Sequence, residues 1–311
     1  MNDLISIFVI IVGIGFAGLV LYLLSYKYSK DKYIDYGDNW TVVEGHITGA
    51  PALLSDFDKI PNATKMVEKY SFDKISDTRF RVFLIIDEHF DKIPNAANII
   101  ERLSHDPVAF IRRGALLGVK KHFDKIPNAA NIIERLSHDS NKFVKSEAAE
   151  GVLSHFDKIP NAAKITEELS YYSDKDIKLQ CVKILKKHFD KIPNAKKIFV
   201  KFSQTSDEDI NPILIKILRY RFNEIPDAPE IFSRILSTIM TTVTKFDNEV
   251  SFLDTLHIFS EHFYEIPDAK EMLKIFVNTN KNYIEDLSRE EYLKNMLENI
   301  FNKISDERIK I

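Results

Sequence analysis

The 311-residue sequence contains a single cysteine, Cys181, and this scarcity excludes both a disulfide within one chain and a cluster of thiolate metal ligands. Glycine occurs nine times and proline eleven times, so the many tight turns of an all-β protein are not expected. Isoleucine and leucine instead recur at helical spacing, which predicts an all-α fold. Cys181 falls on the apolar face of one expected helix, where we expect it to pack in the core.

An excess of one charge sign is also missing. The chain has 43 basic and 46 acidic residues, so nucleic acid is not the expected partner. Residues 1–221 carry 33 basic and 29 acidic side chains, whereas residues 222–311 carry 10 and 17. This asymmetry could steer a bipolar partner, and an ordinary solvated surface explains it equally well.

Sequence motifs for catalysis are absent. No Ser-His-Asp arrangement, His-x-x-x-His pair, P-loop or glycine-rich dinucleotide turn occurs. Adjacent carboxylates such as Glu167 and Glu168 fall on an expected exposed helix, where solvation explains them. We therefore expect no enzyme activity, no catalytic residue, no cofactor and no bound metal.

The longest apolar run, residues 4–24, contains no charged side chain. A helix of this length spans roughly 30 Å, the thickness of a bilayer's hydrocarbon core, so we predict a transmembrane helix. A cleaved signal peptide is the alternative, but it would carry a positively charged start, and only Asp3 precedes the run. Lysines at 27, 30 and 32 follow it, which predicts a single-pass membrane protein with its C-terminal part in the cytoplasm.

A heptapeptide repeat organises the rest of the chain. The string FDKIPNA, or its variants FNEIPDA and FYEIPDA, begins at seven phenylalanines: Phe57, Phe90, Phe123, Phe156, Phe189, Phe222 and Phe263. The first six starts are 33 residues apart and the last step is 41, so residues are inserted near 241–250. Residues 89–106 are identical to 122–139, which indicates duplication.

Each repeat predicts two helices. The first begins after the proline, with Asn95 of the second copy as an N-cap that accepts hydrogen bonds from first-turn amides. The second begins near Asp106 and Pro107 and ends near His122. Each helix has one apolar stripe that it cannot bury alone, so we expect successive hairpins to stack into an α-solenoid.

We predict three regions: a transmembrane anchor at 1–25, a juxtamembrane tether at 26–50 and the solenoid at 51–311. Residues 45–58, which span the boundary between tether and solenoid, would be the remnant of a leading helix, and the charged segment 282–311 would cap the other end.

The segment HDPVAFIRRGALLGV at 105–119 resembles the second helix of HEAT repeats, with its Asp-Pro-x-x-x-Arg-x-x-Ala-x-x-x-Leu pattern. The resemblance to this armadillo-like class covers about residues 50–311 and implies a right-handed solenoid of about six to seven hairpins. Later copies depart from the pattern: Tyr172 and Thr205 occupy positions equivalent to Asp106, and Asn211 occupies a position equivalent to Arg112.

A basic stripe is the candidate partner-binding site. It comprises Arg79, Arg112, Arg113, Lys145 and Lys178 on the expected second helices. The HEAT resemblance implies an alternative, in which this column pairs with the aspartate of a neighbouring repeat. Histidines also recur beside the phenylalanines, and we expect them to interact with helix ends rather than with a metal.

The second helices differ where the first helices do not. Copies two and three share their linker and first helix, yet residues 107–121 and 140–154 differ at most positions expected to be exposed. In HEAT proteins these helices line the concave face, so we expect that face to bind a protein or peptide. The predicted function is a membrane-anchored interaction scaffold. The alternatives are a HEAT-like enzyme or enzyme subunit of the chromophore-lyase type, or a nucleic-acid-binding solenoid.

Overall fold

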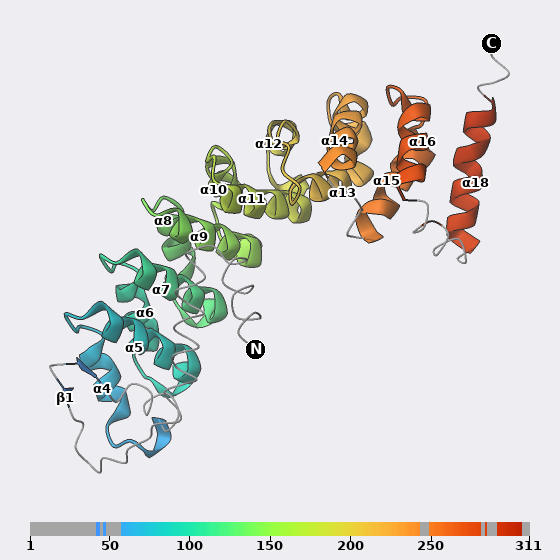
Figure 1. The fold of residues 1–311 in the computed structure, drawn as a ribbon. Helices are drawn as coiled ribbons and strands as arrows, with labels where there is room; N and C mark the ends of the chain where they lie inside the picture. Colours follow the sequence, from blue (N-terminus) through green and yellow to red (C-terminus); the bar gives the residue numbers. More distant parts are fainter. Residues whose placement is uncertain are drawn as a thin grey trace. The chain divides into compact units, whose positions relative to one another are not determined.

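The computed structural model describes residues 42–43, 46–47, 57–242, 249–280, 284 and 291–306. In this part the chain is helical apart from a short hairpin, in which β1 (Val42–Val43) pairs antiparallel with β2 (His46–Ile47) (Figure 1). Sequence analysis placed a helix remnant at 45–58, and at 46–47 that prediction was wrong. Val42, Val43 and Ile47 are β-branched, and such side chains favour extended backbone.

The predicted membrane helix at 4–24 and most of the predicted tether lie outside the described residues. Among the helices that the structure does describe, none is both long enough and apolar enough to span a bilayer.

The chain divides into two compact units, unit 1 (residues 1–158) and unit 2 (residues 159–311). The described hairpins of unit 1 are α4 (Ala63–Tyr70) with α5 (Ser76–His89), α6 (Ala96–Leu103) with α7 (Ala109–Lys121), and α8 (Ala129–Ser137) with α9 (Lys142–His155). Short 3-10 turns carry the repeated Phe-Asp-Lys: η1 (Phe57–Lys59), η2 (Phe90–Lys92), η3 (Phe123–Lys125) and η4 (Phe156–Lys158).

Unit 2 repeats this pattern. Its hairpins are α10 (Ala162–Leu169) with α11 (Lys175–His188), α12 (Ala195–Ser203) with α13 (Asn211–Arg221), and α14 (Ala228–Thr242) with α15 (Glu249–His262). The turns η5 (Phe189–Lys191) and η6 (Phe222–Glu224) precede α12 and α14, and α16 (Ala269–Thr279) and α18 (Glu291–Asp306) follow.

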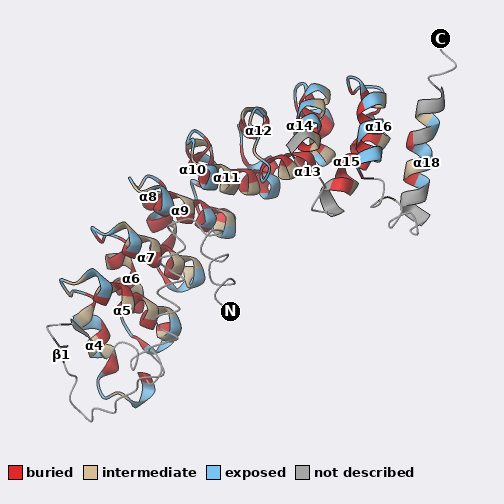
Figure 2. Cartoon of the chain, viewed as in Figure 1, coloured by how far each residue is buried: buried red, intermediate tan, exposed pale blue. Residues whose placement is uncertain are grey.

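Helices stack in the same way within each unit. Second helices pack on second helices, α5 on α7 and α7 on α9 in unit 1, and α11 on α13 and α13 on α15 in unit 2. The first helices α4, α6, α8, α10 and α12 each pack on the second helix of their own hairpin, and Phe232 of α14 contacts Phe259 of α15. The buried residues lie along these contacts (Figure 2). The predicted apolar columns are buried, among them Ile99, Ile132, Val119 and Val152, and so is Cys181. The prediction of stacked hairpins that share a core is thus confirmed within each unit.

Two glycines allow the second helices to approach the first helices closely. A Cβ atom on Gly118 would lie 2.8 Å from Cδ1 of Ile100, and one on Gly151 would lie 3.0 Å from Cδ1 of Ile133. These glycines occupy the same column in copies two and three, so a packing requirement accounts for their repetition.

The repeated asparagine was predicted as a side-chain cap, and this was wrong. Asn95 holds the N-cap position of α6, yet its side chain accepts no hydrogen bond from the helix. In the next repeat, Nδ2 of Asn128 instead donates to Oε1 of Glu101, at 3.0 Å. The asparagine therefore connects neighbouring hairpins.

The second helices begin later than predicted. Val108 is the N-cap of α7, and the carboxylate of Asp106 accepts a hydrogen bond from the Val108 amide at 2.9 Å. Asp106 thus forms an Asx turn ahead of the helix. Side-chain caps do occur on later second helices, where Asn141 accepts from the amide of Phe143 and Asp174 accepts from that of Asp176.

The inserted residues lengthen a helix. The first helix α14 has 15 residues, whereas α4, α6, α8, α10 and α12 have 8 or 9. Part of the insertion near 241–250 therefore extends α14 to Thr242, and residues 243–248 lie outside the described part.

Candidate protein-binding faces

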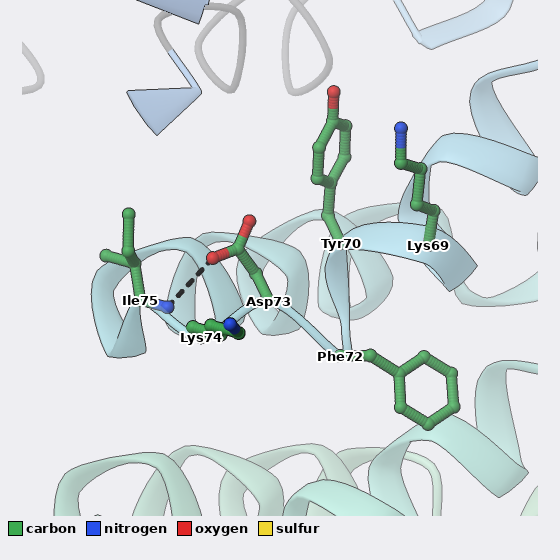
Figure 3. A pocket seen from close by; sticks show the side chains of 6 residues that line it. All are labelled: Lys69, Tyr70, Phe72, Asp73, Lys74 and Ile75. Atoms are coloured by element: carbon green, nitrogen blue, oxygen red, sulfur yellow. Dashed lines mark hydrogen bonds between the residues drawn. The ribbon is translucent and has the colours of Figure 1, made fainter. Parts of the chain in front are cut away.

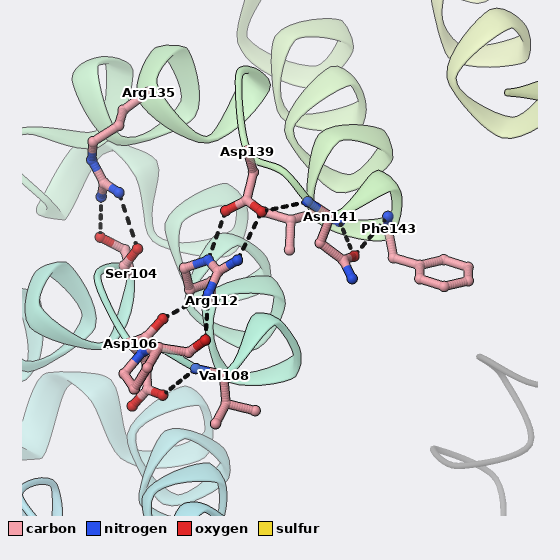
Figure 4. Close-up of polar contacts among 10 residues, drawn as sticks. Ser104, Asp106, Val108, Arg112, Arg135, Asp139, Asn141 and Phe143 are labelled. Carbon is pink, nitrogen blue, oxygen red and sulfur yellow. Dashed lines mark hydrogen bonds and ion pairs between the residues drawn. The ribbon is translucent and has the colours of Figure 1, made fainter. Parts of the chain in front are cut away.

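The basic stripe of unit 1 forms a ladder with aspartates (Figure 4). Arg79 donates from Nε and Nη2 to the Asp106 carboxylate at 2.5 and 2.9 Å, and Arg112 donates likewise to Asp139 at 2.6 and 2.8 Å. The side chains of Arg112 and Asp139 are only 14% and 6% exposed. Pairing within the chain, the alternative implied by the HEAT resemblance, is therefore what the structure shows for these two arginines.

The ladder shifts the pKa of its members. Burial raises the pKa of the Asp139 carboxyl, but hydrogen bonds from Arg112 and from the Asn141 amide outweigh burial and leave that pKa below its usual value. The hydrogen bond to Asp139 raises the pKa of Arg112 in turn. Both groups are thus held in their charged forms.

Arg113, the third candidate, is also paired within the chain. Its Nε lies 3.0 Å from Glu147, and Nζ of Lys120 lies 2.5 Å from the same carboxylate. Glu147 is buried, and it stands in the column of Gly114. Arg113, Lys120 and Glu147 therefore form one ion cluster, and several differences between copies two and three complement one another in it. Sequence analysis missed the cluster because it compared equivalent positions of the repeats and not residues that contact one another across them.

The last two candidates differ from the first three. Lys145 is buried, at 9% exposure. Lys178 is half-buried, and no described carboxylate forms an ion pair with it, because Thr205 replaces the aspartate of the ladder. Burial lowers the pKa of Lys201, and the charge of Lys178 lowers it further. Of the five candidates, Lys178 has the charge that is least engaged.

A second ladder explains the repeated Asp-Lys of the heptapeptide. Each lysine pairs with the aspartate one repeat earlier: Lys92 with Asp58, Lys125 with Asp91, and Lys158 with Asp124. In η6 a glutamate, Glu224, replaces the lysine, and Arg221 pairs with both Asp190 and Glu224. The contact thus survives the change of sequence.

The repeated histidines stack on phenylalanines of the preceding repeat. The ring centroids are 4.1 Å apart for Phe90 with His122, and 3.9 Å apart for Phe222 with His262. His155 also lies with Nε2 2.8 Å from the carbonyl oxygen of Lys120. Aromatic packing therefore accounts for this column. Among the described residues, no group of three His, Cys, Asp or Glu side chains could hold a metal ion.

A third ladder joins serines to basic residues, and sequence analysis did not find it. Arg135 donates from Nη2 to Oγ of Ser104 at 2.6 Å, and Ser104 donates to the carbonyl oxygen of Glu101. In unit 2, Arg234 donates to Oγ of Ser203 at 3.0 Å. Since these serines are buried, the ladder satisfies polar groups inside the stack.

Large apolar side chains remain exposed at the start of the second helices of unit 1. Val108, Phe110 and Phe143 are 37%, 42% and 38% exposed, and Phe110 and Phe143 occupy equivalent positions on the packed helices α7 and α9. Phe110 also contacts the buried Phe80, at 4.2 Å between ring centroids.

An open pocket of about 480 Å³ lies where α4 passes into α5 (Figure 3). Its lining includes Phe72 and Asp73, and the Asp73 carboxylate accepts a hydrogen bond from the Ile75 amide at 2.8 Å. Arg102 lies over the Phe72 ring at 3.6 Å. Asp73 and Arg102 thus make contacts within the chain.

No protein-family model and no curated protein matches this chain. Among solved structures, the X-ray structure of YibA from Escherichia coli is similar, with a TM-score of 0.55 and 15% sequence identity over 84% of this chain and 96% of that one. The crystal structure of an engineered protein matches with a TM-score of 0.45 and 12% identity, over 78% of this chain and 68% of its own. The likeness to YibA concerns the fold alone.

Proposed function

We propose that this chain is a membrane-anchored scaffold of HEAT-like repeats that binds another protein through its second helices. The observation that carries the proposal is the pair Phe110 and Phe143, two equivalent aromatic side chains left exposed on adjacent second helices. Aromatic residues on a rigid surface are frequent anchors of protein interfaces.

The ladders support this assignment by exclusion. The repeated aspartates, lysines, histidines and serines are engaged between hairpins, and the apolar columns are engaged in the core. Among the exposed positions that remain, those on the second helices are the ones where copies two and three differ. Because the ladders hold these helices in fixed positions, a partner would find a preorganised surface and lose little entropy in ordering it.

The membrane anchor rests on the sequence. Residues 4–24 form an uncharged apolar run of bilayer length, and the lysines that follow favour a cytoplasmic location for the repeats. A right-handed solenoid, as the HEAT resemblance implies, would present the second helices along its concave face. Such a scaffold would hold its partner close to the membrane surface.

Site-specific photo-cross-linking tests the binding surface. A photoreactive phenylalanine analogue replaces Phe110 or Phe143 in the full chain, in cells that express it. The matched control sites are Asn98 and Asn131, which are exposed at equivalent positions on the first helices α6 and α8. We expect the same discrete protein to be cross-linked from positions 110 and 143 and not from 98 and 131. An even distribution over all four sites, or no cross-link at 110 and 143, would contradict the proposal.

A surface exchange sharpens this test. Lys142→Ala and Glu150→Leu place side chains of α7 on α9 and should weaken the cross-link from position 143. Glu147 has to be retained, because its loss would leave Arg113 and Lys120 without their partner. An unchanged cross-link would indicate that the partner does not recognise the side chains that distinguish α9 from α7.

Membrane extraction tests the anchor separately. We expect the full chain to stay with the membrane after alkaline carbonate washing, and a chain without residues 1–25 to be released. Release of the full chain would refute the anchor and leave the binding surface standing.

A further inference from the structure

One face of unit 2 carries an unusual density of positive charge. Helices α11 and α13 together contain eight lysines and arginines and a single acidic residue, Asp176. Lys183 and Lys186 on α11 stand in the same repeat columns as Lys216 and Arg219 on α13. Since the two helices pack on each other, these four residues, Lys183, Lys186, Lys216 and Arg219, form one basic patch.

The three lysines of the basic patch differ from its arginine in their partners. Arg219 is paired, with Nη1 2.5 Å from the carboxylate of the fully buried Asp254 on α15. No carboxylate among the described residues forms an ion pair with any of the three lysines. Burial lowers the pKa of Lys186, and the charges of Lys216 and Lys183 lower it further, whereas Asp254 opposes this effect. The three lysines therefore lie close enough to repel one another.

An apolar strip accompanies the basic patch. Leu179 lies four residues before Lys183 on α11, and Pro212 lies four residues before Lys216 on α13. Leu253 holds the corresponding place on α15. All three are half-buried, so each keeps apolar surface in contact with solvent. A ligand that matches this face would combine negative charge with apolar side chains.

We propose that the basic patch and the apolar strip dock an acidic, amphipathic polypeptide segment of a partner protein. This inference rests on the proposed scaffold function and names the chemistry of one partner. Carboxylates of the segment would pair with the three lysines, and its apolar residues would cover Leu179, Pro212 and Leu253. Charge complementarity of this kind fixes register and speeds association.

A nucleic acid fits this face less well. Residues 159–311 as a whole carry 23 basic and 25 acidic side chains, so outside the four-residue patch acidic side chains outnumber basic ones. A long phosphate backbone that ran beyond the patch would gain little counterion release there. A short acidic segment can end where the patch ends.

The test measures binding of a fluorescent synthetic peptide of repeated Glu-Glu-Leu to the full chain in uncharged detergent micelles. We expect saturable binding that weakens with added salt. Replacing the three lysines by Lys183→Gln, Lys186→Gln and Lys216→Gln should weaken it by at least about tenfold. The matched control is Lys196→Gln with Lys197→Gln on the first helix α12, where both lysines are exposed, and it should change binding by less than about twofold.

Two further probes decide between ligand classes. A Lys-Lys-Leu peptide should not bind, and a single-stranded oligothymidine of equal charge should bind more weakly than the acidic peptide. Equal or tighter binding of the oligothymidine through the same lysines would overturn the polypeptide assignment, and so would peptide binding that the triple variant leaves intact. If the triple variant fails to fold, the single variant Lys186→Gln, at an exposed position, takes its place, and its affinity for the peptide is compared with that of the wild-type chain. Should the peptide fail while the cross-links from positions 110 and 143 stand, this inference falls and the scaffold function remains.

Discussion

Units 1 and 2 stack their helices in the same way but treat their charges differently. In unit 1 the arginines of the second helices pair with aspartates, as Arg112 does with Asp139, and Glu147 neutralises two further cations. In unit 2 the aspartate column has become Tyr172 and Thr205, and no described carboxylate forms an ion pair with the lysines of the basic patch. The helices stack in the same way in both units, so the stacking depends on the apolar core. The arginine–aspartate ladder is not required for it, and in unit 2 basic residues lie at the surface instead.

The largest effect is expected where the charge ladder is complete. Arg112→Met removes the partner of Asp139, which is 6% exposed, and should cost unit 1 about 3 kcal/mol because a buried carboxylate loses its cation. The equivalent change in unit 2, Lys178→Met, breaks no ion pair and should cost less than about 0.5 kcal/mol. Hydrogen exchange of α7–α9 and of α11–α13 measures the two units separately.

This pair of variants can break the comparison between the units. If Lys178→Met destabilises unit 2 as much as Arg112→Met destabilises unit 1, the two columns have the same structural role. The lysines of the basic patch could then no longer be interpreted as residues that are freed from pairing with an aspartate.

A smaller and equal effect is expected where the units agree. Ser104→Ala in unit 1 and Ser203→Ala in unit 2 each remove a buried hydroxyl that accepts a hydrogen bond from an arginine, Arg135 or Arg234. Each change should cost about 1 to 2 kcal/mol, since a partly buried guanidinium loses an acceptor. The exposed Ser154→Ala is the control and should stay within about 0.5 kcal/mol in urea unfolding. Unequal losses at 104 and 203 would show that the serine ladder matters in one unit only.

The smallest effect is expected in the basic patch and has the opposite sign. Lys186→Gln removes a charge that partial burial and then repulsion by Lys216 and Lys183 disfavour, and it should stabilise unit 2 by a few tenths of a kcal/mol at neutral pH. The pKa of Lys186 is lower in the folded chain than its usual 10.5, so the folded state releases this proton first as the pH rises. The difference in unfolding free energy between variant and wild type should therefore be full at neutral pH and shrink as the pH rises toward 10.5. A difference that grows with pH would refute repulsion as its cause.

Much of the fold could be predicted from the sequence because helical stacking follows from local and repeated features. The 33-residue period, the apolar stripes and the proline of each linker predicted two helices per repeat and the buried columns. The helix starts were less well predicted, since Asp106 accepts a hydrogen bond ahead of its helix and Asn128 donates one to the neighbouring hairpin. The sequence identifies a side chain that can accept a hydrogen bond at a helix start, but it does not show which donor lies close enough to form that bond.

The sequence by itself determined the period, the helix content and the faces that had to be buried, because these depend on spacing along one chain. The tertiary structure decided which charges meet, because the partners of Arg113 and Arg135 come from neighbouring hairpins of the stack. Three of the five basic residues proposed for binding proved to be paired within the chain. Among the described residues, Lys183, Lys186 and Lys216, which sequence analysis had passed over, form no ion pair with a carboxylate, and neither does Lys178. A side chain's charge is written in the sequence, but its neutralisation depends on distance across packed helices, and only the fold sets that distance.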